Sequence, residues 1–126
     1  MTVLLVEDDA DLGEMYKLQL GQAGWQVVIA DNAQAALDAL DRAAVEVIVL
    51  DILLPLSNGL SLLYELRSYS DWSKIPVIIL SNVPVKEIGL AEAALERLGV
   101  MAYLDKTRTN HRELITAVQA VSTANA

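Results

Sequence analysis

The sequence predicts an α/β domain in which helices cover both faces of a parallel sheet. Short apolar runs alternate with longer segments that have helical periodicity. A helix-forming segment rather than a tight turn follows each run, as in strands joined by crossover connections. The third run, residues 45–50, is apolar at five of six positions and contains three valines. That composition is typical of a strand buried on both faces.

The apolar runs define five expected strands, at residues 3–6, 26–30, 45–50, 75–80 and 100–104. The first helix is expected between the first two strands, with Gly24 after its end. The second helix begins after Asp31 or Asn32, and either side chain could cap it. The third helix follows Gly59.

Proline and glycine mark the expected limits of the fourth helix. Pro84 suits the first turn of a helix, and Gly99 suits the position just after its end. Its expected apolar stripe consists of Ile88, Ala91, Leu95 and Leu98. The fifth helix follows the last strand, and residues 122–126 are expected to form a frayed tail.

The composition limits the possible functions. A chain of 126 residues has the length of one compact domain, so residues 1–126 are expected to form a single unit. There is no cysteine for disulfides or thiolate metal sites. A formal net charge of −8 argues against direct nucleic-acid binding and favours a cation as the small partner. No signal peptide or membrane-spanning run is visible, so we expect a cytoplasmic protein without membrane contacts.

Polar residues directly follow four of the five expected strands. They are Glu7 and Asp8, Asp51, Ser81 and Lys106. Because parallel strands end at the same edge of a sheet, we expect these side chains to converge there, where α/β proteins place their ligands.

The predicted cluster has a definite chemistry. Neighbouring carboxylates raise one another's pKa unless a cation joins them. Ligands that offer only oxygen select a hard ion, and a partly open site suits Mg²⁺. An aspartate beside Mg²⁺ and a lysine is arranged to accept a phosphoryl group as a covalent nucleophile.

With these residues in place, the sequence resembles a response-regulator receiver domain of two-component signalling. The similarity runs from Val3 through the last helix. Its motifs are Val6-Glu7-Asp8-Asp9, Asp51 with Leu54-Pro55 and Gly59, Ser81 at the end of the fourth strand, and Tyr103-Leu104-Asp105-Lys106. The resemblance implies a doubly wound five-stranded sheet in the order 2-1-3-4-5, flanked by five helices, with flavodoxin-like topology.

The resemblance also implies a role for each acidic residue. Asp51 would take a phosphoryl group from the phosphohistidine of a sensor histidine kinase or a phosphotransfer protein. Asp51 and Asp8 would bind Mg²⁺ directly, Glu7 through a coordinated water, and Leu53 through its backbone carbonyl. The protein would be a signalling phosphoacceptor rather than a conventional enzyme.

Three further residues gain roles by the same resemblance. Lys106 would pair with Asp51 and then with the phosphoryl oxygens, and Ser81 would donate its hydroxyl to one of them. Tyr103 would swing inward with Ser81 and switch the surface around the fourth and fifth helices. The added charge of roughly −1.5 to −2 would drive this change. The downstream protein target, and whether the protein is a monomer or dimerises on phosphorylation, stay open.

Simpler interpretations exist for several of these residues. Asp9 and Asp11 are expected to stabilise the first helix by placing negative charge at its positive N-terminal end. Ser81 could be an ordinary helix cap, Lys106 a solvated lysine and Tyr103 a partly buried aromatic residue.

Two departures from the family pattern support an alternative function. The family usually has proline after the lysine, where this chain has Thr107, and alanine where it has Asn82. A cis bond before a non-proline residue costs about 2.5–4 kcal/mol. The loop therefore either carries strain or runs trans and places Lys106 differently. The alternative is a receiver-fold docking module that works without phosphorylation.

Two other protein classes fit less well. A haloacid-dehalogenase-type phosphatase needs a second acid two residues after the nucleophile, where this chain has Leu53. A flavodoxin or a dinucleotide-binding protein needs a phosphate-binding loop rich in glycine or hydroxyl residues after the first strand, and this chain has acids there.

Overall fold

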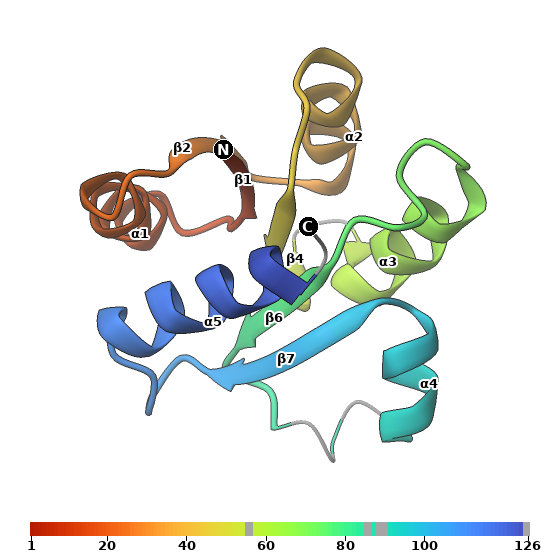
Figure 1. The fold of residues 1–126 in the computed structure, drawn as a ribbon. Helices are drawn as coiled ribbons and strands as arrows, with labels where there is room; N and C mark the ends of the chain where they lie inside the picture. Colours follow the sequence, from red (N-terminus) through yellow and green to blue (C-terminus); the bar gives the residue numbers. More distant parts are fainter. Residues whose placement is uncertain (55–56, 85–86, 88–90, 125–126) are drawn as a thin grey trace.

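Five parallel strands form the central sheet. The computed structural model describes residues 1–54, 57–84, 87 and 91–124. The sheet has the order β2-β1-β3-β6-β7, which is the predicted order 2-1-3-4-5 (Figure 1). Its strands are β1 (Thr2–Val6), β2 (Gln26–Ala30), β3 (Val47–Leu50), β6 (Val77–Ser81) and β7 (Val100–Asp105).

Helices cover both faces of this sheet, as predicted. They are α1 (Ala10–Gln22), α2 (Ala33–Arg42), α3 (Gly59–Ser68), α4 (Glu92–Arg97) and α5 (His111–Ala124). Figure 1 shows α1 and α5 on one face and α2, α3 and α4 on the other. Strand β1 alternates between two cores, because Val3 and Leu5 pack on the α1–α5 side while Leu4 and Val6 pack on the other side.

Side-chain caps start the first two helices. The Asp9 carboxylate accepts a hydrogen bond from the Leu12 N–H at 3.1 Å, and Asn32 accepts one from the Ala35 N–H at 2.9 Å. Asn32 rather than Asp31 is therefore the cap of α2. Asp9 serves its helix, as expected from its position.

The fourth helix begins later than expected. Helix α4 begins only at Glu92, and Ala91, expected within the helix, is extended with φ −68° and ψ 152°. Upstream, the Glu87 N–H donates to the Pro84 carbonyl at 2.9 Å, a single helical turn at the proline. Ile88 lies outside the described residues.

The sequence did not predict a short antiparallel pair after Asp51, formed by β4 (Leu53–Leu54) and β5 (Ser57–Asn58). At the other end of the chain, α5 continues through Ala124, into the segment expected to fray, and buries Ser122. Residues 125 and 126 lie outside the described part.

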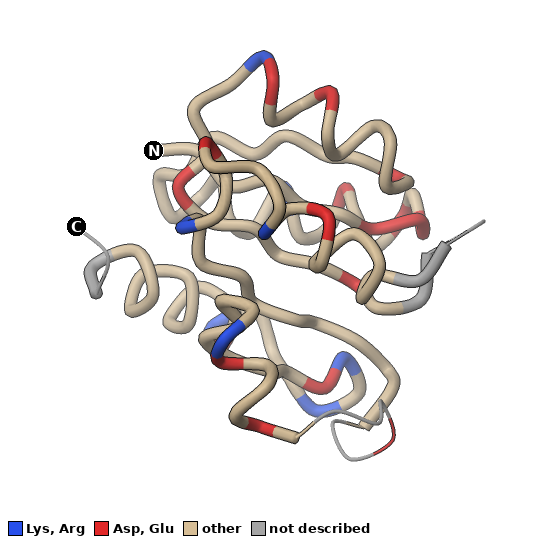
Figure 2. Tube along the Cα trace, turned by 90° about the vertical axis from the view of Figure 1, so that its right-hand side faces the viewer, with Lys and Arg blue, Asp and Glu red and all other residues tan. Residues whose placement is uncertain are grey.

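No helix within the described residues is long and apolar enough to cross a membrane. Acidic positions outnumber basic ones along the chain, and the Lys and Arg positions are scattered rather than gathered (Figure 2).

Candidate functional site

The backbone brings the predicted polar residues to one edge of the sheet. The Glu7 N–H donates to the Ala30 carbonyl at 2.9 Å, and the Asp51 N–H donates to the Val6 carbonyl at 3.0 Å. These bonds continue the strand ladders by one residue, so both acids stand at the ends of neighbouring strands. Glu7 and Asp51 are buried, with 2% and 6% exposure.

The chain packs closely around the backbone of Asp51. Gly59, the first residue of α3, donates its N–H to the Ile52 carbonyl at 2.6 Å. A Cβ at Gly59 would lie 2.5 Å from the Asp51 carbonyl oxygen and 2.9 Å from the Ile52 Cα. Only glycine lets α3 start this close to Asp51.

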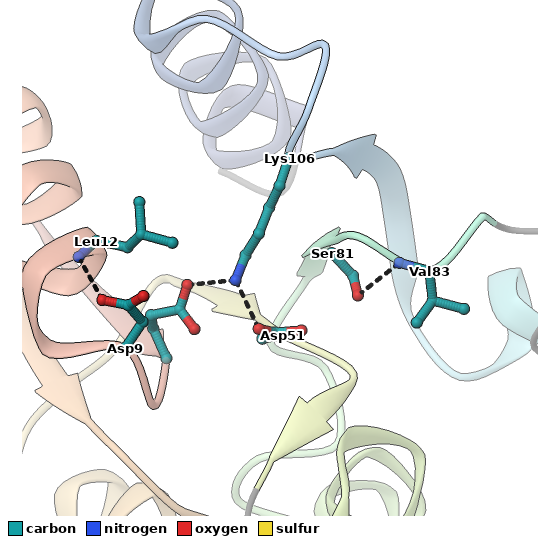
Figure 3. Close-up of polar contacts among 7 residues, drawn as sticks. Asp9, Leu12, Asp51, Ser81, Val83 and Lys106 are labelled. Carbon is teal, nitrogen blue, oxygen red and sulfur yellow. Dashed lines mark hydrogen bonds and ion pairs between the residues drawn. The ribbon is translucent and has the colours of Figure 1, made fainter.

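The Lys106 ammonium joins the two buried acids. It lies 2.5 Å from Glu7 Oε1 and 2.7 Å from Asp51 Oδ2, with the lysine side chain 9% exposed (Figure 3). These contacts are the only ion pairs within the described residues. The predicted meeting of Glu7, Asp51 and Lys106 at one edge is therefore present.

Burial and charge act in opposite directions on this cluster. Burial raises the pKa of Glu7, the Asp51 carboxylate raises it further, and the contact with Lys106 only partly offsets the rise. For Lys106, burial alone lowers the pKa, but the hydrogen bonds to Asp51 and Glu7 outweigh it, so its pKa is raised. The ammonium therefore stays charged, and the pair of carboxylates remains short of positive charge.

The acidic group has the composition of a site for a hard cation. Glu7, Asp8 and Asp51 each offer a carboxylate oxygen, and these oxygens lie within 4.8 Å of one another. Glu7 Oε2 is buried and has no hydrogen-bond partner, while Asp8 is exposed. A buried carboxylate oxygen without a partner is costly. The donor set therefore fits a divalent cation such as Mg²⁺. Leu53 begins β4 two residues after Asp51, and the role of its carbonyl stays a prediction.

Ser81 and Tyr103 both bind the backbone of Val83, at the two different peptide groups on either side of its Cα. The Val83 N–H donates to Ser81 Oγ at 3.2 Å, and the Tyr103 hydroxyl donates to the Val83 carbonyl (Figure 3 for Ser81). Ser81 is fully buried, and burial raises the pKa of the Tyr103 phenol. Ser81 therefore holds the loop that follows β6 and does not cap a helix directly.

The loop after β7 adopts one of the two forms expected from Thr107. The Lys106–Thr107 bond is trans, and the Lys106 ammonium contacts Asp51. The Thr107 N–H and hydroxyl both donate to Asp105 Oδ1, at 2.8 and 2.7 Å. These bonds lower the pKa of Asp105, first through the hydroxyl. Asp105 and Thr107 thus form a turn that sequence reasoning missed, although Asx turns of this kind are common.

With this geometry established, the comparisons with known proteins are specific. The model of the response regulator receiver domain matches residues 3–119. The chain belongs to this family. Its members include curated response regulators, so the resemblance inferred from the sequence motifs is confirmed.

Curated relatives of this receiver domain are regulatory proteins. The chain is 33% identical over 119 residues to the transcriptional regulatory protein CpxR of Escherichia coli, covering 94% of this chain and 48% of CpxR. It is 39% identical over 108 residues to MalR of Bacillus subtilis, covering 84% of this chain and 44% of MalR. The chain therefore spans about half the length of the curated relatives it matches.

Solved receiver structures share the whole fold. The receiver domain of the Francisella response regulator 1452 is 28% identical, with a TM-score of 0.85, and the match covers 99% of this chain and 98% of that one. The chemotaxis protein CheY4 of Vibrio cholerae is 25% identical, with a TM-score of 0.84 and coverage of 95% and 97%. A CheY-like, flavodoxin-type fold is thus shown.

Proposed function

We propose that this receiver domain, as a single unit, accepts a phosphoryl group on Asp51 in a two-component phosphorelay. The observation that carries the proposal is the environment of the Asp51 carboxylate, at the end of a buried strand and 2.7 Å from the Lys106 ammonium. A buried carboxylate that was only structural would need no second acid beside it, yet Glu7 shares the same ammonium. An excess of negative charge at one point favours a function.

In the proposed reaction, an Asp51 carboxylate oxygen attacks the phosphorus of a phosphohistidine on a sensor histidine kinase or phosphotransfer protein. The phosphorus–nitrogen bond breaks as the phosphorus–oxygen bond forms, and the histidine keeps the electron pair. Lys106 is placed to follow the phosphoryl oxygens, because its ammonium already contacts Asp51. Ser81 Oγ accepts from Val83, and its own hydrogen is available to donate to a phosphoryl oxygen.

The cation of this reaction would be Mg²⁺, held by Asp8, Asp51 and the Leu53 carbonyl, with Glu7 acting through water. The carboxylate cluster and the unpartnered Glu7 Oε2 support this assignment. Bound Mg²⁺ supplies positive charge that stabilises the transferring phosphoryl oxygens. Glu7 Oε1 already serves the Lys106 ammonium, which leaves Oε2 as the oxygen that would face the metal-bound water.

The proposed response runs from Ser81 to Tyr103. Ser81 binds the N–H of Val83 and Tyr103 binds its carbonyl, so movement of Ser81 toward a phosphoryl oxygen would shift Val83 and pull on its bond to Tyr103. The affected surface contains α4, β7 and α5 and would bind a protein target. A phosphoryl group adds roughly two negative charges, enough to shift a local two-state equilibrium.

The test is the intact mass of the protein after incubation with acetyl phosphate, with and without Mg²⁺, beside Asp51→Asn. A single phosphoryl adduct that requires both Mg²⁺ and Asp51 supports the proposal. The alternative is a docking module that works without phosphorylation. It would be indicated by no adduct, together with no chemical-shift response to Mg²⁺ or beryllofluoride.

A further inference from the structure

Arg67 is a partly buried cation near the C-terminal end of α3, whereas the same helix begins beside Asp51. Arg67 stands in the last turn of α3, and its guanidinium donates to four backbone carbonyls. Nη1 donates to Trp72 at 3.0 Å and to Ser73 at 2.8 Å, Nη2 donates to Ile75 at 2.8 Å, and Nε donates to Leu98. No carboxylate within the described residues pairs with it.

Two of these carbonyls stand just before the strands that carry the site. Ile75 lies two residues before β6, and Leu98 lies two residues before β7. The first bond between these strands joins the Val77 N–H to the Gly99 carbonyl at 2.9 Å. One planar guanidinium thus spans the two chain segments where the pairing of β6 with β7 begins.

Gly99 makes room for this contact. Its φ is +82°, and a Cβ at this position would lie 2.3 Å from Arg67 Nη2 and 2.7 Å from Cζ. Gly99 was expected from the sequence only as the residue that ends a helix. In the structure the missing side chain also leaves the space that the guanidinium fills.

The pairing that starts here is irregular. Val77 pairs with Val100, but Ile78 pairs with Ala102, so β7 contains one extra residue, Met101, at this step. Beyond the shift, the register is regular up to the functional site.

The register beyond this shift determines which residues reach the site. It pairs Ser81 with Asp105 and lets the Lys106 N–H donate to the Ser81 carbonyl at 3.1 Å. A slip by one residue moves every side chain of a strand to the opposite face. Lys106 and Tyr103 would then face away from Asp51 and Val83.

We propose that Arg67 is a positioning residue that fixes the register of β6 against β7 and so places Lys106 and Tyr103 beside Asp51 and Ser81. The effect on phosphorylation rests on the proposed function, whereas the effect on register does not. A lysine has a single ammonium and cannot span the same carbonyls, since its three donors leave from one point.

The variants that test this are Arg67→Met, which keeps the apolar stem, and Arg67→Lys, which keeps the charge. Arg42→Met is the matched control, because the exposed Arg42 donates to a single carbonyl, that of Asp38. Each variant is compared at a temperature where circular dichroism shows it fully folded. Amide hydrogen exchange and cross-strand nuclear Overhauser effects are then measured across β6–β7 and, as an internal reference, across β1–β3.

Arg67→Met should speed amide exchange across β6–β7 about tenfold or more, because several hydrogen bonds are lost at that end. The β1–β3 amides should change less. The Ser81–Asp105 cross-strand contacts should weaken or acquire a second set, and Asp51 phosphorylation should slow. Arg67→Lys should lie between Arg67→Met and wild type, and Arg42→Met should match wild type.

Equal changes across β6–β7 and β1–β3 would overturn the proposal, because they mean general destabilisation. Unchanged β6–β7 contacts in Arg67→Met would overturn it as well. If wild type takes no phosphoryl group, the proposed function fails while the register measurements still decide this inference.

A double-mutant cycle gives an independent readout. Gly99→Ala in the wild type meets both the positive φ and the guanidinium, whereas in Arg67→Met it meets the φ alone. The effect of Gly99→Ala on β6–β7 exchange should therefore be smaller in the Arg67→Met background. Additive effects would contradict a direct contact between the two residues.

Discussion

Strands β6 and β7 have a cation near each end, and the two cations are held differently. At the carboxyl end, Lys106 contacts two carboxylates that are also candidate metal ligands. At the amino end, Arg67 contacts only backbone carbonyls. A carboxylate can exchange its partner for a metal or a phosphoryl group, whereas a backbone carbonyl just before a strand cannot move without moving the chain that leads into the strand. The first cation suits a reaction and the second suits a fixed geometry.

The largest expected effect is the loss of stability when the Arg67 guanidinium is removed. Arg67→Met should lower the free energy of unfolding by about 3 kcal/mol, because the variant leaves several partly buried carbonyls without their charged donor. Urea unfolding monitored by circular dichroism measures it. Arg42→Met, the exposed control, should stay within about 0.5 kcal/mol of wild type. Equal losses in the two variants would remove the distinction between the partly buried Arg67 and the exposed Arg42.

Loss of the Lys106 ammonium should change the rate of phosphorylation. Lys106→Met should slow phosphorylation of Asp51 by acetyl phosphate about 100-fold, as removal of one preorganised donor does at other reaction centres. Mass spectrometry over time measures the rate in the presence of Mg²⁺. A normal rate in Lys106→Met would show that the ammonium does not stabilise the transferring group.

A pH series sharpens the contrast at Glu7. Its pKa is raised in the folded protein, first by burial, so between the unfolded and folded pKa values the folded state binds more protons. Stability without metal should therefore fall as pH rises through the raised pKa. Glu7→Gln should flatten this dependence, as followed by urea unfolding in EDTA from acid to neutral pH. Parallel curves for the two proteins would assign the pH dependence to other groups.

The smallest expected effect concerns the Tyr103 hydroxyl, an uncharged donor. Tyr103→Phe removes one hydrogen bond to the Val83 carbonyl and should cost about 1 kcal/mol or less. Exchange of the Val83 amide should rise while that of β3 stays the same. No change at Val83 would mean that the bond to Ser81 is enough to hold this residue.

The sequence predicted that Glu7, Asp51 and Lys106 meet, but it did not predict the contacts of Arg67, for a physical reason. Glu7, Asp51 and Lys106 follow apolar strands, and strand ends in a parallel sheet must meet at an edge. Charged residues directly after apolar strands are visible in the sequence by their residue type alone. The partners of Arg67 are backbone carbonyls, which every residue has, so no residue type marks them.

The fourth helix shows the same limit. Pro84 and the apolar spacing favoured one helix from Pro84 onward, whereas α4 begins at Glu92 and the Val83 carbonyl just before Pro84 accepts a bond from Tyr103, twenty positions away in the sequence. A contact over that separation lies outside any local window of the sequence, where propensity is only a weak guide.

Helix α3 sets the distance between the backbone of Asp51 and the segments that lead into β6 and β7. Its first residue, Gly59, lies against the backbone of Asp51, and the Arg67 guanidinium near its last residue donates hydrogen bonds to the segments just before β6 and β7. The eight residue steps from Gly59 to Arg67 set this spacing along the helix axis at about 12 Å. One residue more or less would turn Arg67 by about 100° around the helix and away from its carbonyls. The length of α3 therefore cannot change by even one residue without loss of these contacts. An insertion in α3 should destabilise the domain more than most single substitutions.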